Sequence, residues 1–121
     1  MLLQRLKREV LHANQEIVRQ RLVVSTFGNV SGTARDQSLV AIKPSGVPYD
    51  ALTPEDTVVT DLEGKIVEGS LRPSFYLATH LVLYRAFPQI GGVVHTHREY
   101  AIAWTQAGMP IPCYGTTHAD Y

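Results

Sequence analysis

The chain has 121 residues, 45% of them hydrophobic, with 11 Lys and Arg balanced by 11 Asp and Glu, and it contains one cysteine. This length allows one domain, and zero net charge argues against a protein that nucleic acid or an anionic membrane holds by bulk charge. Cys113 cannot form an internal disulfide, no apolar run approaches the roughly 20 residues that span a bilayer, and the charged N-terminal segment is unlike a signal peptide. We therefore expect a cytoplasmic protein that binds neither nucleic acid nor membrane.

The first half of the chain predicts a helix followed by a hairpin. Apolar side chains recur at three- to five-residue intervals between residues 2 and 22, with charged side chains mostly on the other face, which predicts an amphipathic helix. A strand from Val30, a polar turn at residues 35–38 and a second strand over residues 39–42 form the predicted hairpin. The sequence Lys-Pro-Ser-Gly at residues 43–46 then ends the second strand in a loop.

Two more strands are predicted in the middle of the chain. A helical turn opens at Pro54, and the β-branched residues 57–61 form a strand. A turn follows, and a return strand begins at Ile66.

The second half predicts helices on either side of a short apolar strand. Ser74 is a good N-cap for a helix that runs to about Phe87 and ends before Pro88. The glycine-flanked apolar run at residues 91–95 predicts a buried central strand, and residues 98–107 predict a further helix that stops at Gly108. Helices mixed with hairpin strands indicate an α/β fold in which helices cover a sheet.

Two histidines at the end of the apolar strand form the sharpest candidate site. His95 and His97 are two residues apart, so a strand places both imidazoles on one face. Two neutral imidazoles suit Zn²⁺ or another divalent metal, although a pair of polar residues where a strand leaves the core has the same pattern. His118 could be a third ligand or an exposed loop histidine. Asp120 could transfer protons or cap a turn.

Two loops rich in Gly, Ser and Asn could bind an anion such as phosphate. Residues 28–32 and 43–46 offer backbone N–H groups, hydroxyls and the ammonium group of Lys43. Ser74 at a predicted helix N-terminus would add to such a site. Each loop alone is equally typical of a plain turn.

Taken together and in this order, GNVSG, KPSGVPY, the Pro73–Ser74 step, VVHTH and GTTHADY resemble the class II aldolase/adducin family, and within it the branch of L-ribulose-5-phosphate 4-epimerases. The likeness runs across essentially all 121 residues. It implies a three-layer α/β/α fold with a mostly antiparallel central sheet. It also implies a homo-oligomer, a tetramer in the family, with sites between subunits.

The resemblance also implies a reaction and the residues that carry it. The reaction inverts C4 of a phosphorylated pentulose, L-ribulose 5-phosphate, by retro-aldol cleavage and re-addition with Zn²⁺ or another divalent metal. His95 and His97 would bind the metal, and Asp120 would transfer protons. The implied substrate-binding residues, chiefly for the phosphate end, are Gly28, Asn29, Lys43, Ser45, Gly46 and Ser74.

The sequence departs from the family pattern at two positions and in its extent. Phe75 replaces a phosphate-facing serine, and Tyr76 replaces an acidic residue at the metal. Family chains continue past the HADY loop with a third histidine ligand and a catalytic tyrosine. We therefore expect residues 1–121 to be an incomplete N-terminal domain that lacks the C-terminal part of the site. The alternatives are a class II aldolase for another sugar phosphate and a non-catalytic adducin-like interaction module.

Overall fold

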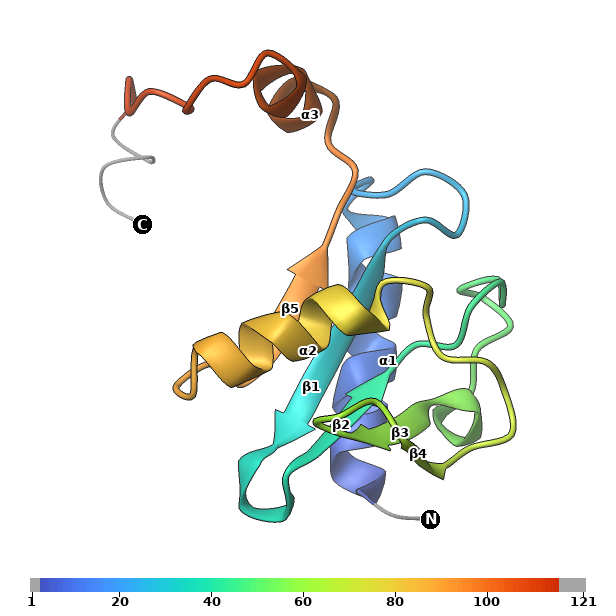
Figure 1. Ribbon diagram of the computed structural model, residues 1–121. Coiled ribbons are helices and arrows are strands. Elements are labelled where there is room, and N and C mark those ends of the chain that lie inside the picture. Colours follow the sequence, from blue (N-terminus) through green and yellow to red (C-terminus); the bar gives the residue numbers. More distant parts are fainter. Residues whose placement is uncertain (1–2, 116–121) are drawn as a thin grey trace.

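A five-stranded antiparallel sheet forms the middle layer of the computed structural model, which describes residues 3–115 (Figure 1). The strand order is β4-β3-β2-β1-β5. The strands are β1 (Asn29–Ala34), β2 (Leu39–Ile42), β3 (Val58–Asp61), β4 (Ile66–Glu68) and β5 (Gly92–His95). The helices are α1 (Gln4–Arg19), α2 (Leu77–Ala86) and α3 (Glu99–Gln106), with short 3₁₀ turns η1 (Arg35–Gln37) and η2 (Pro54–Asp56).

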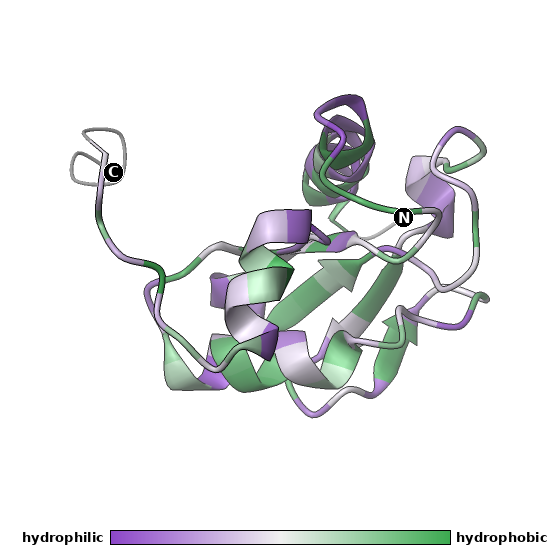
Figure 2. Cartoon of the chain, turned by 90° about the horizontal axis from the view of Figure 1, so that it is seen from above, coloured by the Kyte–Doolittle hydropathy of each residue, from purple (hydrophilic) through white to green (hydrophobic). Residues whose placement is uncertain are grey.

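The sheet separates two helices, which confirms the predicted α/β/α layers. Figure 2 shows hydrophobic strands lying between α1 and α2. On the α1 face, Ile17 packs with Val30, and on the α2 face Val40 packs with Leu81 and Tyr84. Successive residues of a strand point to opposite faces, so β1 contributes side chains to both cores.

Helix α1 is tied to the sheet by polar groups as well as by apolar packing. The buried amide of Asn14 accepts a hydrogen bond from the backbone N–H of Val30 at 2.8 Å and donates to the carbonyl of the same residue at 3.1 Å. Buried Lys7 forms an ion pair with Glu68 of β4 at 2.5 Å. These contacts fix both the position and the rotation of α1 on the sheet.

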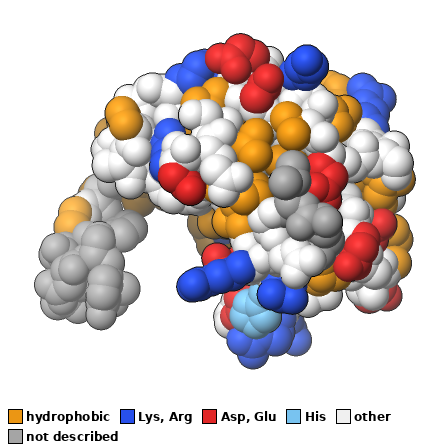
Figure 3. Space-filling model, turned by 90° about the horizontal axis from the view of Figure 1, so that it is seen from below, with side chains coloured by type: hydrophobic (Ala, Val, Ile, Leu, Met, Phe, Trp, Pro, Cys, Tyr) orange, Lys and Arg blue, Asp and Glu red, His pale blue; other side chains and the backbone are white. Residues whose placement is uncertain are grey.

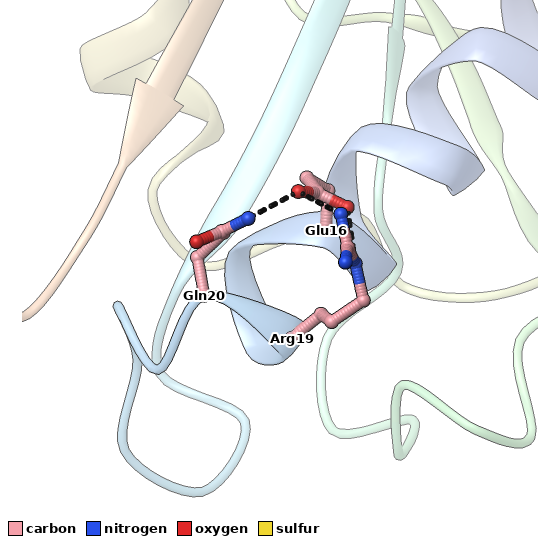
Figure 4. A network of polar contacts seen from close by, with 3 residues as sticks. All are labelled: Glu16, Arg19 and Gln20. Carbon is pink, nitrogen blue, oxygen red and sulfur yellow. Dashed lines mark hydrogen bonds and ion pairs between the residues drawn. The ribbon is translucent and has the colours of Figure 1, made fainter.

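The exposed end of α1 carries a local polar network. Glu16 accepts hydrogen bonds from Arg19, at 2.8 and 2.7 Å, and from Gln20 at 2.7 Å (Figure 4).

Acidic and basic side chains are interspersed around exposed hydrophobic groups on the face seen in Figure 3, as the balanced composition predicts. Within residues 3–115, no helix combines the length and the apolar character needed to cross a membrane.

Two details differ from the sequence predictions. The second helix begins at Leu77, and Ser74 is therefore not its N-cap; its hydroxyl instead accepts a hydrogen bond from the N–H of Tyr76 at 3.4 Å. The prediction of a central, buried strand at β5 is wrong, because among the described residues β5 is an edge strand that pairs only with β1. Its apolar run resembles that of a strand covered on both faces, yet Val94 is 58% exposed.

The core beneath α2 contains a chain of hydrogen-bonded polar side chains. The Ser31 hydroxyl lies 2.6 Å from Nδ1 of His80 and 2.7 Å from the Tyr84 hydroxyl. All three side chains are almost fully buried. Burial, with a smaller contribution from the charge of His95, lowers the pKa of His80 from 6.5 to about 4, so this imidazole is neutral in the folded protein.

We predict that stability falls as the pH is lowered from 6.5 to 4, because the unfolded chain then binds a proton at His80 that the folded chain does not. The pKa difference corresponds to a loss of up to about 3 kcal/mol. Urea denaturation across this pH range measures it. His80→Gln should flatten the pH dependence, whereas His12→Gln, at an exposed site on α1, should retain it. An unchanged pH dependence in His80→Gln would show that other groups cause it.

Candidate functional site

Loops from distant parts of the chain meet at one end of the sheet. Strand β1 runs antiparallel to both β2 and β5, so its first residue lies next to the last residues of both neighbours. There they form a cavity of about 360 Å³. Its lining residues are Thr26, Phe27, Gly28, Asn29, Lys43, Pro44, Ser45, Gly46, Ser74, Phe75 and Tyr76.

Two backbone hydrogen bonds join the loop after β2 to the segment before α2. The N–H of Ser45 donates to the carbonyl of Arg72 at 2.8 Å, and the N–H of Ser74 donates to the carbonyl of Lys43 at 3.0 Å. Gly46 has a φ of +73°, a left-handed conformation that glycine adopts without steric cost. This pairing brings residues from the two loops to one cavity.

Gly28 allows the backbone to pass close to its neighbours. A Cβ atom at this position would lie 1.9 Å from Cγ1 of Val23 and 3.1 Å from the carbonyl oxygen of His95. The hydroxyl of buried Tyr49 donates a hydrogen bond to the Gly28 carbonyl. The loop before β1 therefore packs closely against β5, and the hydrogen bond from Tyr49 also holds it in place.

Lys43 places a buried positive charge at the cavity. Its side chain is only 3% exposed, and its ammonium group donates to the carbonyl of Pro44 at 3.1 Å and lies 4.8 Å from the ring centroid of Tyr49. In the described part of the chain it forms no salt bridge with a carboxylate. Burial lowers the pKa of Lys43. A buried cation without a counter-charge is costly, so this cavity favours an anionic ligand.

The structure brings the two candidate metal-binding histidines together beside this cavity. The ring centroids of His95 and His97 lie 4.8 Å apart, and Nε2 of His97 is buried without a hydrogen-bond partner. The N–H of His97 donates to the carbonyl of Leu22 at 2.8 Å, which fixes the segment after β5. Burial, followed by the charge of His97, lowers the pKa of His95 and so favours the neutral imidazole that a metal requires.

Asn29 contacts the ring of His95. It lies opposite His95 in the β1–β5 register, and its side-chain nitrogen is 3.3 Å from Nδ1 of His95, while its oxygen is buried without a partner. Rotating the amide by 180° would let that oxygen accept a hydrogen bond from Nδ1–H. Nε2 of His95 would then carry the lone pair, which is the arrangement found in metal-binding histidines held by a second hydrogen bond.

Aromatic rings connect the histidines to the cavity. The Tyr76 ring meets His95 edge-on with centroids 4.3 Å apart, and Phe27 lies 6.2 Å from His97. Residues 3–115 contain no group of three or more His, Cys, Asp and Glu side chains that could hold a metal. The two imidazoles are therefore candidates for two ligands of a divalent metal, with Tyr76 beside them.

The six predicted substrate-binding residues all line the cavity, and the histidine pair adjoins it. Asp120 and His118 lie outside the described residues. Thr26, Phe27 and Tyr49 were not among the predicted site residues. Tyr49 belongs to the KPSGVPY motif, and that motif could have identified it as a site residue. No local sequence feature distinguishes Thr26 and Phe27 from other loop residues. Cys113, the one cysteine, is exposed.

Comparisons with known proteins find relatives of the chain in both sequence and structure. Residues 8–121 match the model of the class II aldolase and adducin N-terminal domain. The chain is 56% identical over 119 residues to L-ribulose-5-phosphate 4-epimerase UlaF of Salmonella paratyphi C and of Salmonella typhi, covering 98% of this chain and 52% of those proteins. The chain therefore spans about half the length of the curated relatives it matches.

Solved structures also resemble this chain in fold. An L-fuculose 1-phosphate aldolase superposes with a TM-score of 0.84 at 33% sequence identity, covering 88% of this chain and 50% of that one. The L-fuculose-1-phosphate aldolase of Thermus thermophilus gives a TM-score of 0.67 at 31% identity, with 88% and 52% covered. In both cases the similarity covers about half of the other chain.

We predict that Gly28→Ala destabilises the fold by about 1–3 kcal/mol, the usual cost of forcing extra atoms into a packed region. The new methyl group would collide with Val23. Gly91→Ala is the matched control, because a Cβ there meets no atom within 4 Å. Urea denaturation of both variants gives the comparison, and equal stabilities would contradict the close packing described for Gly28.

Proposed function

The chain belongs to the class II aldolase and adducin N-terminal domain family, and on this basis we propose that it binds the phosphate group of a sugar phosphate and supplies two ligands to a divalent metal. The proposed reaction is the metal-dependent C4 epimerisation of L-ribulose 5-phosphate. The 56% identity to proteins named for that reaction supports it. The proposed setting is a cytoplasmic homo-oligomer that acts on a phosphorylated pentulose.

The observation that carries the proposal is the buried ammonium group of Lys43. It lines the cavity, it is almost inaccessible, and no described carboxylate pairs with it. A phosphate group would supply the missing negative charge. The serine hydroxyls of residues 45 and 74 line the same cavity and could donate to phosphate oxygens.

Each residue then has a defined task. Lys43 and the two serines would hold the phosphate end, and Gly28 lets the loop before β1 pack against Val23 beside them. Asn29 would orient His95, which binds the metal together with His97. A divalent metal, Zn²⁺ in our proposal, would stabilise the negative charge that develops as a carbon–carbon bond breaks. We assign proton transfer to Asp120.

A class II sugar-phosphate aldolase is the second candidate, because an L-fuculose 1-phosphate aldolase superposes with a TM-score of 0.84. Both candidates use the same phosphate and metal sites and differ in substrate. Parallel assays with L-ribulose 5-phosphate and L-fuculose 1-phosphate, each with added divalent metal, distinguish them. A non-catalytic module is the third candidate, favoured by the phenol ring of Tyr76 beside His95.

We predict that Lys43→Met raises the dissociation constant for inorganic phosphate about tenfold or more, since a hydrogen bond to a charged group contributes about 1.5–3 kcal/mol. Isothermal titration calorimetry measures the change. Lys65→Met, at an exposed turn position, is the control and should bind like the parent chain. Burial lowers the pKa of Lys43, so its ammonium group loses its proton at a lower pH than that of an ordinary lysine. As the pH is raised, phosphate affinity should therefore begin to fall at a lower pH than it would for an ordinary lysine. Equal affinity in both variants would contradict the assignment.

We predict that His95→Ala and His97→Ala each lower the affinity for Zn²⁺, because each removes a proposed ligand. Equilibrium dialysis with metal analysis gives the stoichiometry and affinity without depending on activity. His12→Ala removes an exposed histidine of α1 and should have no effect. If the folded parent chain binds no more metal than the two single variants, the interaction module becomes the preferred function.

A further inference from the structure

Tyr49 contacts both of the loops that carry the proposed anion site. Its hydroxyl donates a hydrogen bond to the carbonyl of Gly28 in the loop before β1. Its ring faces the ammonium group of Lys43 at the end of β2, with the nitrogen 4.8 Å from the ring centroid. Gly28 and Lys43 line the cavity, and Tyr49 does not. Tyr49 therefore contacts the site residues from the protein side.

The core on the α1 face fixes the position of the Tyr49 ring. The side chain is buried and packs with Ile17 of α1, Val30 of β1 and Leu52. Burial raises the pKa of Tyr49, so the phenol keeps its proton and remains the donor to Gly28. A ring held in this way offers its face to a cation at a constant place.

The ring stabilises the charge of Lys43 without cancelling it. One of the three N–H donors of the ammonium group goes to the carbonyl of Pro44 at 3.1 Å. The face of an aromatic ring within about 6 Å attracts a cation, and Tyr49 meets this condition. A carboxylate in the same place would also attract the cation, but its charge would repel a phosphate group. The positive charge therefore stays available to an anion in the cavity.

We propose that Tyr49 is a positioning residue of the anion site: its ring keeps Lys43 in place as a cation, and its hydroxyl keeps the Gly28 loop beside it. The inference rests on the anion-binding part of the proposed function and adds a residue that does not line the cavity. Burial lowers the pKa of Lys43, and the ring opposes this effect, because contact with an aromatic face favours the charged form.

NMR of the lysine side chains in the full chain tests the role of the ring without any ligand. The ε-methylene protons of Lys43, assigned by their loss in Lys43→Met, should be shifted upfield, because they adjoin the nitrogen that lies over the ring. Tyr49→Phe keeps the ring and should retain both this shift and the pKa of Lys43. Tyr49→Met fills much of the same space with a flexible side chain. It should lose the upfield shift and lower the pKa of Lys43 below that of the parent chain.

Isothermal titration calorimetry with inorganic phosphate tests the effect on binding. Tyr49→Phe should raise the dissociation constant about two- to tenfold, the range that corresponds to one lost hydrogen bond, because the Gly28 loop is then held less firmly. Tyr49→Met should raise it further. Tyr84→Phe is the matched control, because it also removes a buried hydroxyl, from the core on the other face of the sheet. This variant should bind phosphate like the parent chain.

The results distinguish failure of this inference from failure of the proposed function. An unchanged pKa of Lys43 in Tyr49→Met overturns the inference. An ordinary chemical shift of the Lys43 ε-methylene protons in the parent chain also overturns it, and that measurement needs no variant to fold. If Tyr84→Phe weakens phosphate binding as much as Tyr49→Phe does, the positioning role of the hydroxyl is wrong. If the parent chain binds no phosphate although the NMR results are as expected, the proposed anion site fails and the effect of the ring on Lys43 stands.

Discussion

The register of β1 with its two neighbours is the constraint on which the site depends. Asn29 is paired with His95 on one side, and Ser31 is paired with Ile42 on the other. Because both pairings are antiparallel, the start of β1 lies beside the ends of β5 and β2, where the histidines and Lys43 follow. A shift of one residue would turn Asn29 to the other face of the sheet and separate it from the His95 ring.

The core beneath the sheet holds this register through polar as well as apolar groups. Val30 faces α1 and is bound by the amide of Asn14, whereas Ser31 faces α2 and contacts His80 and Tyr84. A register shift would leave these buried groups without partners, and each unpaired group costs about 1–3 kcal/mol. The interior therefore specifies one alignment of the strands, and that alignment positions the proposed phosphate and metal sites.

Much of this arrangement could be predicted from the sequence, because local patterns determine it. The spacing of apolar residues in α1 predicted the observed helix. The two-residue spacing of His95 and His97 predicted imidazoles that lie next to each other. The edge position of β5 and the burial of Lys43 could not be predicted, because both depend on contacts between segments far apart in the chain. The N-cap prediction for Ser74 failed for a related reason: the segment before α2 pairs with the loop after β2, through the Ser74 N–H and the Lys43 carbonyl, and the helix begins only at Leu77.

Loops from separate parts of the chain meet at the start of β1, and in our proposal they form one anion site there. Titration of ¹⁵N-labelled protein with inorganic phosphate, followed by heteronuclear NMR, tests this most directly. We predict that the backbone amide signals of residues 28–29, 43, 45–46 and 74 shift together with a single dissociation constant, while those of the β3–β4 turn and of α3 do not move. Shifts that are confined to exposed lysines and arginines elsewhere, or that differ in affinity among the three segments, would contradict the proposal.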